Sequence, residues 1–129
     1  MTLELNYLVL VTALTAILWV PYILNRIAVW GLAEAVGYPE NPKPMARWAE
    51  RLQAAHYNAV ENLVVFAVLV LVADALGISN ETTVLACMIY FWSRLVHVVA
   101  YTFGIPWVRT LAFTAGFLCQ ATLAWQLLA

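Results

Sequence analysis

Four long apolar runs constrain this chain more than any other feature of its sequence. They lie in residues 5–24, 63–73, 82–103 and 107–128, with few interrupting charges, and the second run completes a helix whose first half, from about residue 46, is amphipathic and charged. A helix needs about 20 apolar residues to cross the hydrocarbon core of a bilayer. Of the 129 residues, 65% are hydrophobic and 10% are charged, whereas a soluble domain is about half apolar and about 25% charged. A soluble chain of this size cannot bury so much apolar surface. We therefore predict an all-α integral membrane four-helix bundle.

Turn-forming residues divide this single domain, residues 1–129, into helices at about 5–30, 46–76, 82–103 and 107–128. Pro21 lies within the first helix and predicts a kink or a local opening there. Residues 31–45 contain three closely spaced prolines, which favour an extended loop and not a helix. Gly77 is expected to end the second helix, and Pro106 suits the first turn of the fourth.

The distribution of charge predicts the orientation in the membrane. All six Lys and Arg residues lie near the first or the third connection, while the second connection carries acids and no base. By the positive-inside rule, the first and third connections are cytoplasmic and both termini are outside. The net charge of −1 gives no reason to expect nucleic acid as a partner. The first apolar run follows Glu4 without a basic segment or a typical cleavage site, so we do not expect a signal peptide.

Polar side chains recur at helical spacing within the second and third helices. Arg51, Asn58 and Glu61 share a face of the second helix. The third helix carries a stripe of four polar residues, Tyr90, Arg94, His97 and Tyr101. Ionisable groups inside membrane helices are costly and indicate a functional site by default. Because basic groups outnumber acids in this cluster, it favours an anionic ligand.

A structural alternative is that Glu61 pairs with Arg94 and holds two helices together. That pair does not account for Arg51 or Arg109. The other reactive side chains have plain structural interpretations. Both cysteines, Cys87 and Cys119, lie in apolar runs and are expected to be small buried hydrophobic residues. The two histidines, His56 and His97, lack companion ligands at metal-binding spacing, so no metal is expected.

Two segments of the chain resemble a known family. The sequence ERLQAAHYNAVEN at residues 50–62 is similar to the signature of the MAPEG family, the membrane-associated proteins in eicosanoid and glutathione metabolism. The sequence RLVHVVAY at residues 94–101, followed by Arg109 and Thr110, resembles a second block of the same family. The short chain is most similar to the bacterial branch, which implies the bacterial cytoplasmic membrane as its location.

The resemblance implies a homotrimer that binds glutathione as a co-substrate between subunits, near the cytoplasmic face. It implies a transferase or peroxidase acting, through an Arg-stabilised thiolate, on hydrophobic electrophiles or lipid hydroperoxides that arrive from the membrane lipids. By position, Arg109 and Tyr101 would act on the thiol. The positions that match binding or neighbouring residues are Arg26, Arg51, Asn58, Glu61, Arg94, His97 and Thr110.

The sequence also departs from the family pattern. Ala54 stands where many catalytic members have a second arginine, and Phe113 stands where some have a tyrosine. A non-catalytic MAPEG-fold membrane protein, with weak or no glutathione binding, is therefore the main alternative. A small drug–proton exporter would need a carboxylate near the middle of a membrane helix. Residues 5–24 contain none, and Glu61 lies near basic partners.

Overall fold

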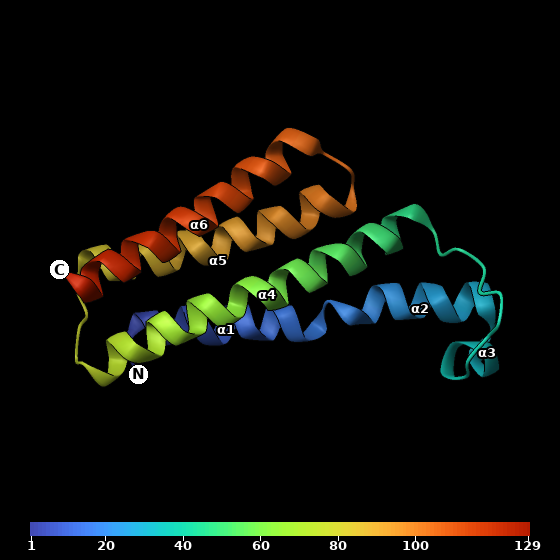
Figure 1. Cartoon of the computed structure of the whole chain (residues 1–129), viewed down its shortest axis with the longest axis horizontal. Helices are drawn as coiled ribbons and strands as arrows, with labels where there is room; N and C mark the ends of the chain where they lie inside the picture. Colours follow the sequence, from blue (N-terminus) through green and yellow to red (C-terminus); the bar gives the residue numbers. More distant parts are fainter.

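The computed structural model describes all residues, 1–129, as a bundle of long helices (Figure 1). Four segments are long and apolar enough to cross a membrane: Leu3–Trp30, Arg47–Ala75, Glu81–Thr102 and Pro106–Leu128. The first comprises α1 (Leu3–Ile17) and α2 (Trp19–Trp30), and the others are α4 (Arg47–Ala75), α5 (Glu81–Thr102) and α6 (Pro106–Leu128). The prediction of an all-α four-helix membrane bundle is confirmed.

The first membrane segment is interrupted at Leu18, between α1 and α2. Pro21 lies three residues further on, so the carbonyl of Ile17 has no proline N–H to accept from, and the proline ring crowds that carbonyl. At the interruption, the N–H of Leu18 bonds the carbonyl of Thr15, three residues back, at 3.4 Å. Helical geometry resumes at Trp19. Pro21 therefore opens the helix locally within the membrane, as its position predicts.

One expectation is wrong, because residues 31–45 are not entirely an extended loop. Residues Leu32–Val36 form a short helix, α3. All three prolines of this connection follow α3 and place no restriction on it, and its Leu, Ala and Glu residues favour helix. Gly31 has a φ of 81° and redirects the chain between α2 and α3. From Gly37 to Ala46 the connection is non-helical, as expected.

Capping residues and glycines define the turns at the other helix ends. The side chain of Asn80 accepts a hydrogen bond from the Thr83 N–H at 3.0 Å, and the Thr83 hydroxyl accepts from the Asn80 N–H at 2.9 Å, which starts α5. Gly77 has a φ of 68° and ends α4 as predicted. Gly104 has a φ of 72° in the α5–α6 turn, and Pro106 occupies the first turn of α6.

The interior contains two apolar clusters, one in each half of the bundle. In the half that holds both termini, the rings of Phe66 and Tyr90 stack with their centroids 3.9 Å apart. The members of that cluster are Leu8, Val11, Phe66, Val70, Ala86, Cys87, Tyr90, Cys119 and Leu123. The second cluster contains Leu18, Tyr22, Ala49, Leu52, Ala55, Ala59 and Val98. Three alanines of α4 in this cluster let neighbouring helices approach α4 closely.

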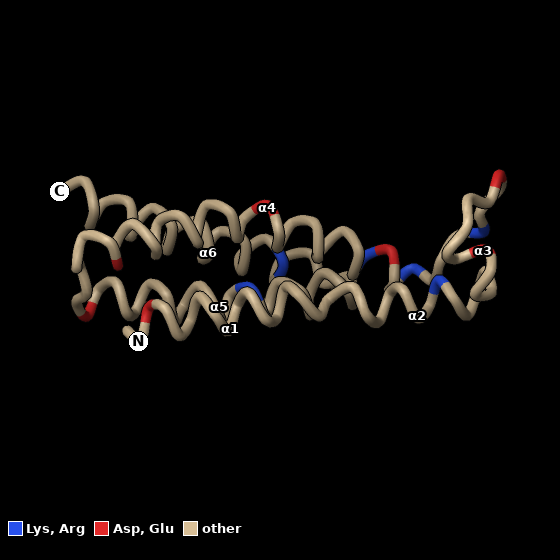
Figure 2. Tube along the Cα trace, turned by 90° about the horizontal axis from the view of Figure 1, so that it is seen from below, with Lys and Arg blue, Asp and Glu red and all other residues tan.

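The two ends of the bundle differ in length and in charge. The first segment (28 residues) and α4 (29 residues) are longer than α5 and α6 (22 and 23 residues). At 1.5 Å per residue they measure about 42 Å against about 33 Å. As a result α2 and the start of α4 project beyond the α5–α6 turn (Figure 1). The Lys and Arg positions run from the middle of the bundle to this projecting end, while the charged residues at the opposite end are all acidic (Figure 2). They are Glu4, Asp74 and Glu81.

Candidate functional site

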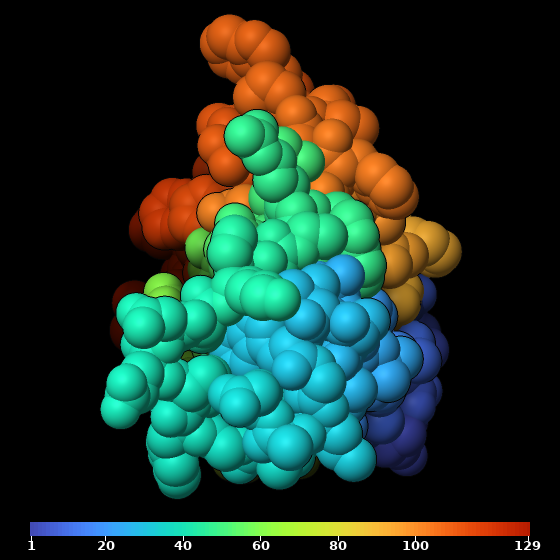
Figure 3. Space-filling view, turned by 90° about the vertical axis from the view of Figure 1, so that its right-hand side faces the viewer, coloured from blue at the N-terminus to red at the C-terminus, as the bar shows by residue number.

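A small pocket lies where the start of α4 meets the α5–α6 turn. Its volume is about 110 Å³. Arg51 from α4, Tyr101 from α5 and Arg109 from α6 line this pocket together with the backbone of the turn. The guanidinium carbon of Arg109 lies 4.8 Å from the centroid of the Tyr101 ring, in a cation–π contact. Three residues predicted for the site, from three helices, are thus brought together. An end-on view shows the start of α4 between α2 and the α5–α6 turn (Figure 3).

Gly104 allows the Arg51 side chain to lie directly against the turn. A Cβ atom added at Gly104 would stand 3.1 Å from the guanidinium carbon of Arg51 and 3.2 Å from its Nη1. These distances are shorter than ordinary contacts of about 3.5–4.0 Å between carbon atoms. The positive φ of Gly104 also favours glycine at this position. Glycine therefore both makes the turn and leaves room for a guanidinium group beside the pocket.

Behind the pocket, the predicted stripe of α5 faces the interior of the bundle. Tyr90, Arg94 and His97 are each no more than 2% exposed. The Nη2 of Arg94 donates to Oδ1 of Asn58 at 2.7 Å and lies 3.4 Å from Nδ1 of His97. The structural alternative paired Arg94 with Glu61, but Arg94 contacts Asn58 and Glu61 is exposed.

His97 connects this buried group with the pocket. Its ring meets the Tyr101 ring edge-on, with the centroids 5.6 Å apart, and lies 6.3 Å from the ring of Phe113. A chain of contacts therefore runs from Asn58 through Arg94, His97 and Tyr101 to Arg109. The Nε of Arg94 is buried without a hydrogen-bond partner. Three guanidinium groups, two in the pocket and one behind it, give this region the positive charge needed to bind and stabilise an anion.

Three predicted site residues lie outside both the pocket and the buried polar group behind it. Arg26 is on α2, where its guanidinium carbon lies 5.1 Å from the centroid of the Trp30 ring. The hydroxyl of Thr110 donates to the carbonyl of Pro106 at 3.2 Å, and the side chain is exposed. Glu61 is exposed midway along α4. A single chain does not bring these three side chains to Arg51 and Arg109.

Sequence reasoning did not identify two amides that belong to the buried polar group. The side-chain Nδ2 of Asn62 donates to the carbonyl of Asn58 at 2.9 Å and lies 3.3 Å from its Oδ1. The Nε2 of Gln120 donates to the carbonyl of Asn62 at 3.1 Å and links α6 to α4. The available signal was the presence of an amide, Gln120, in the apolar stretch of α6, about three helical turns from Arg109, the nearest charge along the chain.

His56, which lies off the face shared by Arg51 and Asn58, has a separate partner. The hydroxyl of Tyr22 on α2 lies 2.8 Å from Nδ1 of His56 on α4. This hydrogen bond crosses the bundle just beyond the break at Leu18. It gives His56 a structural partner between α2 and α4, as the sequence led us to expect.

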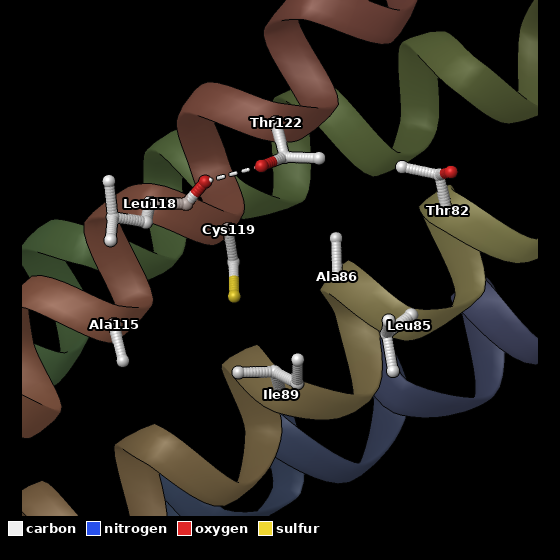
Figure 4. Close-up of a pocket in the computed structure, with 8 residues that line it drawn as sticks. All are labelled: Thr82, Leu85, Ala86, Ile89, Ala115, Leu118, Cys119 and Thr122. Atoms are coloured by element: carbon white, nitrogen blue, oxygen red, sulfur yellow. Dashed lines mark hydrogen bonds between the residues drawn. The ribbon is translucent and has the colours of Figure 1, made fainter.

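A groove between α5 and α6 has no charged lining residue (Figure 4). Its volume is about 290 Å³, and its lining includes Leu85, Ile89 and Leu118. The thiol of Cys119 points into it (Figure 4). Both Cys87 and Cys119 are free and buried, as expected for small hydrophobic residues. This groove is separate from the pocket of Arg51 and Arg109.

Comparison with known proteins identifies several relatives. The MAPEG family model matches residues 9–129. The human microsomal glutathione S-transferase 1 is 31% identical over 98 residues, which cover 73% of this chain and 63% of the human protein. The bovine and mouse proteins of the same name are each 32% identical over 96 residues, covering 71% of this chain and 62% of each relative. The chain thus matches less than two thirds of the length of these relatives. No solved structure matches the chain significantly.

Proposed function

The chain belongs to the MAPEG family, and from this premise we propose that it is a membrane-bound glutathione-dependent transferase or peroxidase. Its second substrates would be hydrophobic electrophiles or lipid hydroperoxides. The observation that carries the proposal is the pocket in which Arg51, Tyr101 and Arg109 converge. Guanidinium groups bind carboxylates in two-point fashion and stabilise nearby anions. Glutathione supplies two carboxylates and an ionisable thiol.

Arg109 is the residue that we assign to the thiol. A thiolate is the reactive nucleophile, and a free thiol has a pKa of about 8.5. Lowering the pKa of the bound thiol by about two units would require roughly 2.7 kcal/mol, which one cation in a partly desolvated pocket can supply. The ring of Tyr101 lies beside the Arg109 guanidinium, so its hydroxyl is a candidate second donor to the sulfur.

The same thiolate serves both proposed reactions. In conjugation, the sulfur forms a bond to the electrophilic carbon, and the leaving group departs with the electron pair. In peroxide reduction, the sulfur attacks the terminal peroxide oxygen, the O–O bond breaks, and the lipid alcohol is released after protonation. A second glutathione then attacks the oxidised sulfur, which gives glutathione disulfide and water. Both routes need only glutathione and the hydrophobic substrate.

The polar face of α4 suits the rest of the tripeptide. Arg51 and Asn58 are separated by about 10 Å along the helix axis, and Glu61 lies about 4.5 Å further on. In the proposed arrangement Arg51 holds a carboxylate, Asn58 anchors the peptide backbone, and Glu61 accepts from the amine. Arg94 and His97 are buried behind this face, and Thr110 lies one residue beyond Arg109.

Assembly as a homotrimer, with glutathione between adjacent subunits, is part of the proposal. A pocket of about 110 Å³ is smaller than the roughly 300–1,000 Å³ that encloses a drug-sized ligand. Glu61 is also exposed midway along a membrane helix, where an uncovered carboxylate is costly. A neighbouring subunit would cover Glu61, enlarge the pocket and bring Arg26 toward it. The resemblance to the MAPEG family is the support for an assembly of three subunits.

For location, we propose the bacterial cytoplasmic membrane, with several passes, both termini outside and the pocket near the cytoplasmic face. The support is the charge asymmetry, because Lys and Arg run from the middle of the bundle to its projecting end, while the opposite end carries acids (Figure 2). Positively charged connections are retained on the cytoplasmic side. Single cysteines introduced at the two ends of the bundle, and labelled from outside in intact cells, test this orientation.

The test of function is glutathione binding and turnover by the purified protein in detergent. Bound glutathione should stabilise the fold by about 2.7 kcal/mol at one hundred times its Kd. Turnover should appear with a hydrophobic aryl halide or a lipid hydroperoxide and should be lost in Arg109→Ala. Arg47→Ala is the matched control, because Arg47 is exposed at the start of α4 and does not line the pocket. Its activity should be unchanged.

The alternative function is a non-catalytic membrane protein with the MAPEG fold. Ala54 favours it, since a side chain without a guanidinium stands where many catalytic members have arginine. This alternative requires that glutathione neither stabilise the wild-type protein nor be consumed with either class of substrate. Stabilisation without turnover would identify a glutathione-binding protein that has lost its catalysis.

A further inference from the structure

A second small polar pocket lies at the opposite end of the bundle from the pocket of Arg51 and Arg109. It is bordered by the start of α1 and the end of α4, and its volume is about 90 Å³. Its polar lining residues are Thr2, Glu4, Asp74 and Ser79. The side chain of Glu4 is only 3% exposed, whereas Asp74 and Ser79 are exposed. A buried carboxylate therefore closes the bottom of a pocket that opens at the surface.

The carboxylate of Glu4 is poorly satisfied within the chain. Its Oε2 accepts a hydrogen bond from the hydroxyl of Thr83 at 3.1 Å. That hydroxyl also lies 3.0 Å from the carbonyl of Asn80, and it has one hydrogen to share between the two acceptors. The Oε1 of Glu4 is buried and has no hydrogen-bond partner. Because a carboxylate can accept about four hydrogen bonds, Glu4 is left as a costly buried charge with at most one.

No basic side chain at this end of the bundle compensates the charge. The charged side chains here are all acidic (Figure 2). The terminal amino group belongs to the exposed Met1 and makes no hydrogen bond with Glu4. Asp74 adds a second negative charge in the last turn of α4, which contains no basic residue. The carbonyl end of a helix is itself partly negative, so an acid there favours a nearby cation.

The donor atoms of the pocket suit a hard cation. They are the carboxylate oxygens of Glu4 and Asp74 and the hydroxyls of Thr2 and Ser79. No third acidic, histidine or cysteine side chain completes a metal-binding group, which disfavours transition metals. Ca²⁺ takes 6–8 oxygen ligands in flexible geometry and accepts carbonyls and waters among them. Since a water occupies roughly 30 Å³, the pocket has room for the ion and one or two waters.

We propose that Ca²⁺ binds in this pocket, with Oε1 of Glu4 as its buried ligand and the carboxylate of Asp74 as its exposed ligand. The two carboxylates balance the charge of one divalent ion. The ion joins the start of α1 to the end of α4 and, through the hydrogen bond between Glu4 and Thr83, to the start of α5. Bound Ca²⁺ therefore stabilises this end of the bundle. The Ca²⁺ site is independent of glutathione binding.

Thermal unfolding of the purified protein in a non-ionic detergent, with Ca²⁺ or with a chelator, tests the proposal. Ca²⁺ should raise the Tm by a few degrees, because a ligand that binds only the folded state stabilises it. Isothermal titration should give a Kd on the order of 0.1–1 mM, the range of weak extracellular Ca²⁺ modules. Mg²⁺ should raise the Tm less, because it requires near-ideal octahedral geometry.

Glu4→Gln is the decisive variant. The amide keeps the size of the side chain but removes its charge, so the shift in Tm with Ca²⁺ should disappear. In the chelator, this variant should be at least as stable as the wild type, because it has no uncompensated buried charge. Asp74→Asn, at an exposed position, should weaken Ca²⁺ binding by at least about tenfold. Glu81→Gln is the matched control, since Glu81 is an exposed acid at the same end that does not line the pocket. Its shift with Ca²⁺ should equal that of the wild type.

Three results would overturn the proposal. The first is a wild-type Tm that Ca²⁺ leaves unchanged. The second is a shift with Ca²⁺ that is equally large in the wild type, Glu4→Gln and Asp74→Asn, because it would reflect general charge screening or binding elsewhere. The third is stabilisation of the wild type by acid, absent in Glu4→Gln, together with no effect of Ca²⁺. A proton and not a metal ion would then neutralise Glu4.

Discussion

Replacement of Gly104 by alanine tests whether the contact between Arg51 and the α5–α6 turn shapes the pocket. The added Cβ would lie 3.1 Å from the Arg51 guanidinium carbon and 3.2 Å from its Nη1. The guanidinium must therefore retreat by a few tenths of an ångström. Gly104 also has a φ of 72°, so the change adds backbone strain. Two effects are expected, one on stability and one on the pocket.

Gly77 allows these two effects to be separated. It also turns the chain at a helix end, with a φ of 68°, but a Cβ there would meet nothing within 4 Å. A left-handed alanine costs about 1–2 kcal/mol, so Gly77→Ala and Gly104→Ala should lose similar stability in mixed-micelle unfolding. Only Gly104→Ala should weaken glutathione binding. Disturbing Arg51 by about 1 kcal/mol corresponds to roughly fivefold in Kd.

Isothermal titration calorimetry of glutathione on the two variants provides the measurement. Arg51→Ala sets the upper limit, because loss of the whole charged contact is expected to cost about 1.5–3 kcal/mol. Adding Gly104→Ala to Arg51→Ala should then have no further effect on Kd. The reasoning is refuted if Gly104→Ala and Gly77→Ala bind glutathione equally well, or if Gly104→Ala still weakens binding after Arg51 is removed.

Three further changes address the thiol, the link between α4 and α6, and the α5–α6 packing. Arg109→Ala should raise the pKa of the bound glutathione thiol, so that thiolate absorbance in the ultraviolet appears only at higher pH than in the wild type. Gln120→Leu removes the bond to the Asn62 carbonyl and should lower the free energy of unfolding by about 0.6 kcal/mol, the average for such bonds in a membrane protein. Gly116→Val should cost about 1–3 kcal/mol by overpacking, because even a Cβ there would lie 3.3 Å from the Ser93 hydroxyl; Gly116→Ala should cost much less. Equal unfolding energies for the two Gly116 variants would contradict the packing argument.

Local sequence patterns were sufficient to predict the membrane segments and their ends. Apolar runs of about 20 residues determine helices that span a bilayer, whatever their neighbours are. Pro21 marked the break at Leu18, and Gly77 and Pro106 marked helix ends, because each acts on its own backbone within a few residues. The same locality explains the error at α3. The effect of the prolines does not extend to Leu32–Val36, which precedes them.

The helical spacing of polar residues predicted which faces would be polar, but it could not predict partners. The stripe of α5 is buried, in agreement with its periodicity. Arg94 had two candidate partners one turn apart on α4, Glu61 and Asn58. The rotation of α4 relative to α5 decides that Asn58 is the partner. That rotation depends on side-chain packing over the whole interface, so spacing within one helix does not contain it.

By itself, the sequence determined that this chain is a four-helix membrane protein with its basic residues in one half, because these properties follow from composition and local spacing. Only the tertiary structure decided which polar groups meet. It brought Arg51 and Arg109 to one pocket beside Gly104, and it joined Gln120 to Asn62 across 58 residues of chain. These contacts depend on how helices cross and on how closely a glycine lets them approach. That information belongs to the packed bundle and to no single helix.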